Sequence, residues 1–168
     1  MRHFLKQFNF HPRKIRVITA PSGKGSAEQF VRKQYAIEVK AYRKRNSSNH
    51  RLVVSIDADT TDVTNRSRQL DKELEQAGLT IRQEQEHILL VIPKRNIETW
   101  IHYLLGHKNV NEETSYRNQY KGKPEGDHSS PAANKLYDIW IQFKSDQSLP
   151  DGLLPSMEIA ITDEFIRL

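Results

Sequence analysis

Cysteine is absent from the sequence, which excludes disulfide bonds and thiolate metal sites. Long hydrophobic runs are absent too: none approaches the roughly 20 apolar residues of a transmembrane helix. Met1 to Lys14 contain no continuous apolar segment like that of a signal peptide. The chain has no Gly-x-Ser-x-Gly motif, so there is no sequence basis for a serine triad. We therefore expect a cytoplasmic protein with no membrane association.

The composition describes a polar globular protein. The 168 residues are enough for one domain with a hydrophobic core, and hydrophobic and charged residues make up 36% and 28% of the chain. The formal net charge of +5 suits a polyanionic partner such as nucleic acid. The alternative is that a modest cationic excess only maintains solubility. Monomer and homo-oligomer both remain open at this point.

Apolar runs and helical periodicities alternate along the chain. Short runs rich in β-branched residues predict strands, and apolar residues spaced three and four apart predict helices. The predicted strands are 14–20, 52–56, 79–83 and 87–92, and the predicted helices are 27–45, one from 60–65 to 77, 96–105, one from 131 and one from 156. This alternation predicts an α/β fold with a mainly parallel sheet flanked by helices.

We expect a single domain over residues 1–168, with an α/β core at 1–106, a loop at 107–130 and a helical C-terminal extension at 131–168. Few apolar residues occur in 107–130, which favours a long surface loop. Pro131 is placed to open the helix that follows, because proline fits the first helical position.

Two aspartates, Asp57 and Asp59, follow the buried run Leu52–Ile56. Ligands of open α/β sheets gather outside the carboxyl ends of the strands, and side chains two positions apart on a strand point the same way. The pair is thus a candidate seat for Mg²⁺, which uses few protein carboxylates and completes its shell with water and phosphate oxygens. The alternative is a helix-capping turn, in which aspartate accepts backbone hydrogen bonds.

The turn Gly23–Ser26 follows the first predicted strand and contains Lys24. It lacks the Walker A spacing, because Gly25 intervenes between Lys24 and Ser26. Backbone N–H groups at the helix start nevertheless make it a candidate phosphate or nucleotide loop. Glu28 lies just after it and is a candidate third carboxylate at the same sheet edge. Its alternative role is a favourable charge in the first turn of a helix.

The segment after the second buried run carries both basic and acidic residues. Lys94 and Arg95 are candidate phosphate ligands, and Glu98 starts a helix at the same expected edge. Glu98 and His102 are four residues apart, a metal-capable spacing that more often marks an ordinary helix pair. A further basic group is a candidate contact for a phosphate backbone or a solvated face, and it comprises Arg43, Lys44, Arg45, His50 and Arg51.

The order of these features resembles the Toprim-like domains, in particular the small stand-alone kind found with ATPase partners in bacterial anti-phage systems, such as the RloB-like and OLD-associated proteins. The similarity lies in Ile56-Asp57-Ala58-Asp59 and in Ile92-Pro93-Lys94-Arg95-Asn96-Ile97-Glu98-Thr99-Trp100, with Glu28 upstream. It covers residues 15–106, and more weakly 155–168. Ala20 stands where the family usually has its glutamate, so Glu28 would take that place.

The resemblance implies a Mg²⁺- or Mn²⁺-dependent nuclease, or a subunit of one, that acts on nucleic acid in antiviral defence. Asp57, Asp59 and Glu28 would then hold the metal, with Glu98 as a further catalytic carboxylate. Lys24, Lys94 and Arg95 would bind phosphate. The alternative is a catalytically degenerate Toprim-like module that binds an ATPase partner or nucleic acid.

Overall fold

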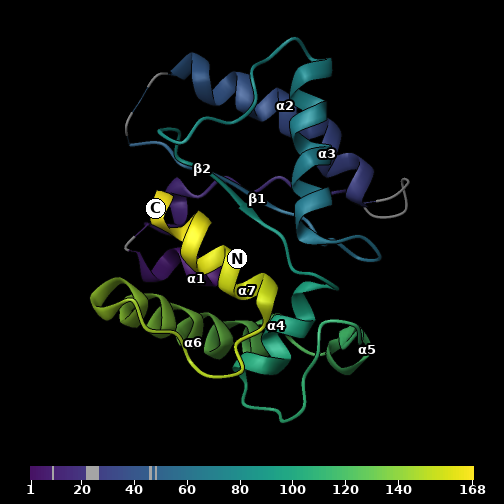
Figure 1. Ribbon diagram of the computed structural model, residues 1–168, viewed down its shortest axis with the longest axis vertical. Coiled ribbons are helices and arrows are strands. Elements are labelled where there is room, and N and C mark those ends of the chain that lie inside the picture. Colours follow the sequence, from purple (N-terminus) through teal and green to yellow (C-terminus); the bar gives the residue numbers. More distant parts are fainter. Residues whose placement is uncertain (9, 22–26, 46, 48) are drawn as a thin grey trace.

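A two-stranded parallel sheet lies at the centre of the protein (Figure 1). The computed structural model describes residues 1–8, 10–21, 27–45, 47 and 49–168. Strand β1 (Leu52–Ser55) pairs with β2 (Ile88–Val91), with Leu52 opposite Ile88 and Ser55 opposite Val91. All four residues of β2 are buried, as expected for a parallel strand covered on both faces.

Helices α2 (Ala27–Arg45) and α3 (Val63–Gln76) cover one face of the sheet (Figure 1). Side chains alternate between the two faces of a strand, so Ile88 and Leu90 point into this layer. There they pack with Tyr35, Val39, Val54, Ile56, Ala58, Leu70, Leu74 and Ile92. The Asp62 side chain caps α3 by accepting the backbone N–H of Asn65. Gly78, in the left-handed region at φ 70°, follows its end.

The opposite face of the sheet is covered by α1 (Arg2–Gln7), α4 (Ile97–Leu104), α6 (Glu125–Asp146) and α7 (Pro155–Ile159) (Figure 1). Leu89 and Val91 point into this layer and share a core with Phe4, Trp100, Trp140, Met157, Ile161 and Phe165, among others. The sheet therefore lies between two helical layers, each with its own hydrophobic core. In the described part of the chain, no helix is long and apolar enough to cross a membrane.

Short helical elements complete the chain. The 3₁₀ helix η1 (Pro12–Lys14) follows α1, and the four-residue helix α5 (Arg117–Tyr120) precedes α6. The C-terminus continues from α7 into the π-helical turn η2 (Ala160–Glu164) and the 3₁₀ turn η3 (Phe165–Arg167).

The sheet is smaller than the sequence predicts. Residues 14–20 form no strand: Lys14 ends η1, and Val17 and Ile18 are 54% and 38% exposed, with no strand of the described residues hydrogen-bonded to them. The predicted strand at 79–83 is also wrong. The guanidinium of Arg43 binds the carbonyls of Thr80 and Ile81, so side chains satisfy this backbone in place of a ladder.

The predicted loop at 107–130 is interrupted by helices. It contains α5, and α6 begins at Glu125, six residues before Pro131. Glu125 and Asp127 lie in the first turn of α6, where negative charge stabilises the helix dipole. Pro131 lies inside the helix, where it removes one backbone hydrogen bond without ending it. The prediction that Pro131 opens the helix is therefore wrong.

Candidate functional site

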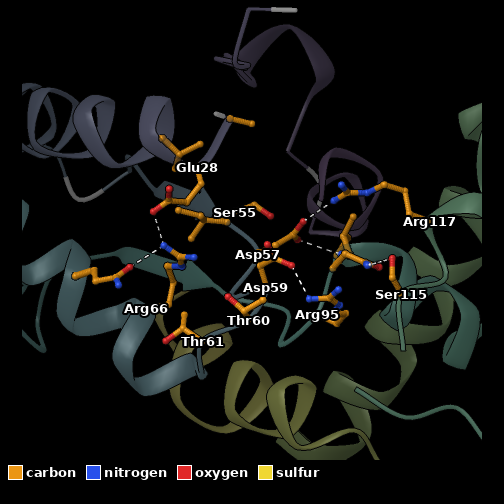
Figure 2. Close-up of a pocket in the computed structure, with 16 residues that line it drawn as sticks. Glu28, Ser55, Asp57, Asp59, Thr60, Thr61, Arg66, Arg95, Ser115 and Arg117 are labelled. Atoms are coloured by element: carbon orange, nitrogen blue, oxygen red, sulfur yellow. Dashed lines mark hydrogen bonds and ion pairs between the residues drawn. The ribbon is translucent and has the colours of Figure 1, made fainter. Parts of the chain in front are cut away.

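A pocket of about 710 Å³ lies beyond the carboxyl ends of β1 and β2 (Figure 2). Its walls come from the first turn of α2, the segment after β1, the start of α3, the segment after β2 and residues 115–117. The charged side chains that line it are Glu28, Asp57, Asp59, Arg66, Arg95 and Arg117. This is the position at which open α/β sheets bind their ligands.

Asp57 is held at the centre of this pocket (Figure 2). Its Oδ1 accepts the backbone N–H of Ile97 at 3.1 Å, and its Oδ2 accepts a hydrogen bond from Arg117 Nη2 at 3.1 Å. Burial raises the pKa of the Asp57 carboxyl to about 6, with Glu98 and Asp59 adding to the rise and Arg117 and the Ile97 amide opposing it. These surroundings thus disfavour the ionised form of Asp57 compared with an aspartate in water.

Asp59 also lines the pocket, but its carboxylate pairs with a different arginine from that of Asp57. Its backbone is in the left-handed region at φ 58°, so the side-chain alternation of a strand no longer applies at this residue. Its Oδ1 accepts from Arg95 Nη1 at 2.7 Å. The intervening Ala58 extends the strand pairing through its N–H to the Pro93 carbonyl at 2.8 Å. Asp57 and Asp59 are thus neighbours whose carboxylates have separate cationic partners.

Glu28 lines the pocket from the first turn of α2 (Figure 2). Its Oε1 accepts from Arg66 Nη1 and, at 3.2 Å, from Arg32 Nη1. The structure therefore brings Glu28 to the same pocket as Asp57 but directs its carboxylate to arginines. Lys24 and the rest of the predicted phosphate loop lie outside the described residues.

Glu98 lies in the first turn of α4, close enough to Asp57 to raise the pKa of its carboxyl. Its Oε2 is buried and has no hydrogen-bond partner among the described residues, and the nearest cationic atom is Arg117 Nε at 3.8 Å. His102 does not face Glu98: its Nδ1 is hydrogen-bonded to the Tyr120 hydroxyl at 2.9 Å. Glu98 Oε2 is therefore a buried acceptor without a hydrogen-bond donor among the described residues, near the carboxyl whose pKa is raised by burial.

Lys94 and Arg95 have different surroundings. Lys94 Nζ donates to the Thr61 carbonyl at 2.8 Å, and its backbone N–H donates to Ser156 Oγ at 3.1 Å. The side-chain hydrogen bond of Lys94 therefore links the segment after β1 to the segment after β2. Arg95 lines the pocket and binds Asp59. Of the two predicted phosphate ligands that the structure describes, Arg95 lines the pocket and Lys94 does not.

Arg66 and Arg117 are pocket residues that the sequence analysis did not identify. Arg66 lies four and eight residues before Leu70 and Leu74, which are buried on α3. A charged residue in that apolar stripe is a detectable signal, because burying a cation requires partners. Its Nη2 donates to the Ala58 carbonyl at 3.1 Å. Arg117 lies in the segment predicted as a loop, and nothing in its sequence surroundings marks it.

Two arginines of the predicted basic group make hydrogen bonds that join separate segments of the fold. Arg43 makes two hydrogen bonds to Glu86, at 2.6 and 2.9 Å, and Arg51 Nε donates to the Leu168 carbonyl at 3.2 Å. These arginines join α2 and β1 to the 80–86 segment and to the C-terminus.

Acidic and cationic side chains line the pocket in equal number, and they form ion pairs with one another. No group of three or more acidic, histidine or cysteine side chains in the described ranges is arranged to hold a metal ion. Mg²⁺ needs only one or two protein carboxylates when a substrate phosphate supplies further oxygens. Arginines released from such pairs present planar donors to phosphate.

The comparisons with known proteins found no relative: no protein-family model, curated protein or solved structure matches the chain.

Proposed function

We propose that the protein is a Mg²⁺-dependent, Toprim-like nuclease or nuclease subunit that acts on nucleic-acid phosphodiesters in bacterial defence. The observation that carries the proposal is the acidic centre of the pocket. Asp57 has its pKa raised to about 6, and beside it Glu98 Oε2 is buried without a hydrogen-bond donor among the described residues. A buried carboxyl with other carboxylates near it is stabilised by a proton or by a bound cation.

The residues of the pocket fit a hard divalent cation. All candidate ligands are oxygen atoms, the type that Mg²⁺ prefers, and the buried Glu98 Oε2 accepts no hydrogen bond from the described residues. Asp57 and Asp59 would hold the ion, with Glu98 adding negative charge close to Asp57. When bound, the ion would polarise a phosphoryl oxygen and lower the pKa of an attacking water.

The arginines of the pocket supply the contacts for the substrate. Arg95 and Arg117 are paired with Asp59 and Asp57, and both are free to turn to a phosphate once a cation neutralises those carboxylates. Arg66 is held in place by Glu28, Gln69 and the Ala58 carbonyl. Glu28 therefore acts in this proposal as a positioning residue that orients Arg66 toward the pocket.

A second candidate function is supported by the same ion pairs. Every carboxylate that lines the pocket has an arginine partner: Glu28 with Arg66, Asp57 with Arg117, and Asp59 with Arg95. A pocket neutralised in this way suits a catalytically degenerate module that binds nucleic acid or an ATPase partner without cleavage. The two candidates differ in whether the pocket binds a divalent cation.

Metal binding and cleavage in matched variants separate the candidates. Asp57→Asn keeps the shape of the side chain and removes its charge, whereas Asp138→Asn makes the same change on the exposed face of α6. We expect Mn²⁺ and Mg²⁺ to raise the melting temperature of the wild type and of Asp138→Asn but not of Asp57→Asn. We also expect metal-dependent cleavage of labelled single- or double-stranded DNA or RNA by the first two proteins only.

Two results would contradict the nuclease proposal. If Asp57→Asn cleaves at the wild-type rate, the metal assignment is wrong. If calorimetry detects no Mg²⁺ or Mn²⁺ binding to the wild type while nucleic acid still binds, the non-cleaving module is the correct function.

A further inference from the structure

A second pocket, of about 290 Å³, lies where the end of α4, helix α5 and the start of α6 meet. Its size is at the lower end of the range for small-molecule sites, which suits a single planar ring system. The residues that line it are Leu105, His107, Gln119, Tyr120, Lys123, Pro124, Asp127 and His128. None of these side chains belongs to the first pocket.

A column of stacked rings ends at this second pocket. The rings of His107 and His102 are 3.8 Å apart at an angle of 9°, and those of His102 and Tyr116 are 4.3 Å apart at 21°. His102 and Tyr116 are buried, whereas His107 is exposed and lines the pocket. A ring stacked on one side still offers its other face. The buried column therefore supports an exposed ring on which a planar ligand can stack.

The other side chains of the pocket combine an aromatic wall with hydrogen-bonding groups. Tyr120 is fixed by the bond between its hydroxyl and His102, and its ring lies 4.8 Å from that of His128. Gln119 offers both donors and acceptors. His128 Nδ1 is buried with no hydrogen-bond partner among the described residues. Stacking faces together with unused polar atoms are the features with which proteins hold an unpaired nucleobase.

Helix α5 connects this pocket to the first one. Ser115 and Arg117 line the first pocket, and Gln119 and Tyr120 line the second. Arg117 and Tyr120 are three residues apart, or roughly 4.5 Å along the helix axis. The surface nearby carries the exposed cations Lys108, Lys121 and Lys123, which suits a phosphate backbone. Because residues of this one short helix line both pockets, the two pockets are neighbouring parts of one surface that a strand could follow.

We propose that the second pocket binds one unpaired base of the strand whose phosphate occupies the first pocket, with that base stacked on His107. This inference rests on the proposed function and narrows it. A base inside a duplex is covered on both faces by its neighbours and can enter such a pocket only after its pairing and stacking are broken. The favoured substrate is therefore single-stranded nucleic acid or an unpaired loop.

Binding measurements in the Asp57→Asn background test the inference without cleavage. Three further variants are compared there: His107→Ala, His107→Phe, which keeps a stacking ring, and Asn118→Ala, an exposed α5 residue that lines neither pocket. We expect His107→Ala to weaken single-strand binding by roughly 5- to 150-fold in Kd. His107→Phe and Asn118→Ala should stay near the parent value. A single 2-aminopurine moved along the strand should be quenched at one position only, and an abasic site there should reproduce the His107→Ala loss.

The outcomes separate the inference from the proposed function. Strand binding that is insensitive to both His107→Ala and the abasic site overturns the inference alone. Equal affinity for a matched duplex, or for a free mononucleotide, also overturns it. Failure of the Asp57→Asn and wild-type proteins to bind any nucleic acid overturns the proposed function as well.

Discussion

Arg117 Nη2 lies 3.1 Å from Asp57 Oδ2, although the two residues are 60 positions apart in the sequence. The Nε atom of the same guanidinium lies 3.8 Å from Glu98 Oε2. One cationic side chain, itself 62% exposed, therefore neutralises two carboxylates at the carboxyl edge of the sheet. Under the proposed function, this guanidinium and a divalent cation compete for the same oxygens.

Removing that competitor should strengthen metal binding. We expect Arg117→Gln to tighten Mn²⁺ binding by roughly 1.5- to 5-fold, because an exposed ion pair is worth about 0.2–1 kcal/mol. Titration calorimetry at low ionic strength measures the change. Lys121→Gln is the matched control, since it removes the same charge from a nearby exposed position that does not line the pocket. Unchanged or weaker Mn²⁺ binding in Arg117→Gln would refute the competition.

Asp57 should make stability depend on pH in a defined direction. Its pKa is raised from 3.8 to about 6 in the folded protein, so between these values the folded state binds more protons than the unfolded state. Stability therefore falls as pH rises through this window. We expect Asp57→Asn to increase the free energy of unfolding above about pH 6, by up to about 3 kcal/mol, and to change it little below about pH 4.

Urea denaturation of Asp57→Asn at several pH values measures this effect. The amide oxygen of asparagine still accepts the Ile97 N–H, so the backbone contact is retained. Asp138→Asn, on the exposed face of α6, should show no such pH-dependent gain. A gain for Asp57→Asn that is the same at both ends of the pH range would rule out the raised pKa as its cause.

Local patterns in the sequence predicted the elements around the candidate site. The run Leu52–Ile56 and the run His87–Ile92 are apolar enough to predict buried parallel strands, and the structure confirms β1 and β2 within them. Because parallel strands align their carboxyl ends, the placement of Asp57, Asp59 and Arg95 beside one pocket followed from the order of elements alone.

Long-range partners could not be predicted in this way. A strand needs a hydrogen-bonded neighbouring strand. The apolar alternation of residues 15–20 does not reveal that the described part of the fold places no strand beside them. Arg117 reaches Asp57 only because α5 is folded against α4 and α6, through the cluster of Ile101, Tyr116, Tyr120 and Ala132. Charge pairing across 60 residues leaves no periodic signal in a single sequence.

A buried ion pair should make a large contribution to stability at the C-terminus. Glu164 accepts from Arg82 Nη2 at 2.8 Å and from the Leu90 N–H at 2.9 Å, which ties η2 to β2. Glu164→Ala leaves the partly buried Arg82 cation without its carboxylate, and we expect a loss of about 3–5 kcal/mol in urea denaturation. Glu164→Gln should lose less, because it still offers an acceptor to Leu90.

The exposed Glu158 of α7 provides the control for this prediction. Glu158→Ala should change stability by about 0.5 kcal/mol or less. Equal losses in Glu164→Ala and Glu158→Ala would show that the ion pair with Arg82 does not stabilise the fold.

Ser156 should be essential to the packing beneath the candidate site. Its buried Oγ accepts from Trp100 Nε1 at 2.8 Å and from the Lys94 N–H at 3.1 Å, and donates to Glu112. Ser156→Ala leaves two donors without an acceptor, so we expect a loss of about 2–3 kcal/mol. Trp100 fluorescence should shift in the folded state, because its indole N–H loses its partner.

Ser148→Ala is the control for this prediction. It removes a hydroxyl whose hydrogen bonds to Asp146 and Gln142 lie in an exposed turn, and it should reduce stability by about 0.5 kcal/mol or less. A similar small loss in Ser156→Ala, with unchanged emission, would mean that water replaces the hydroxyl and that this network does not hold the segment after β2 in place.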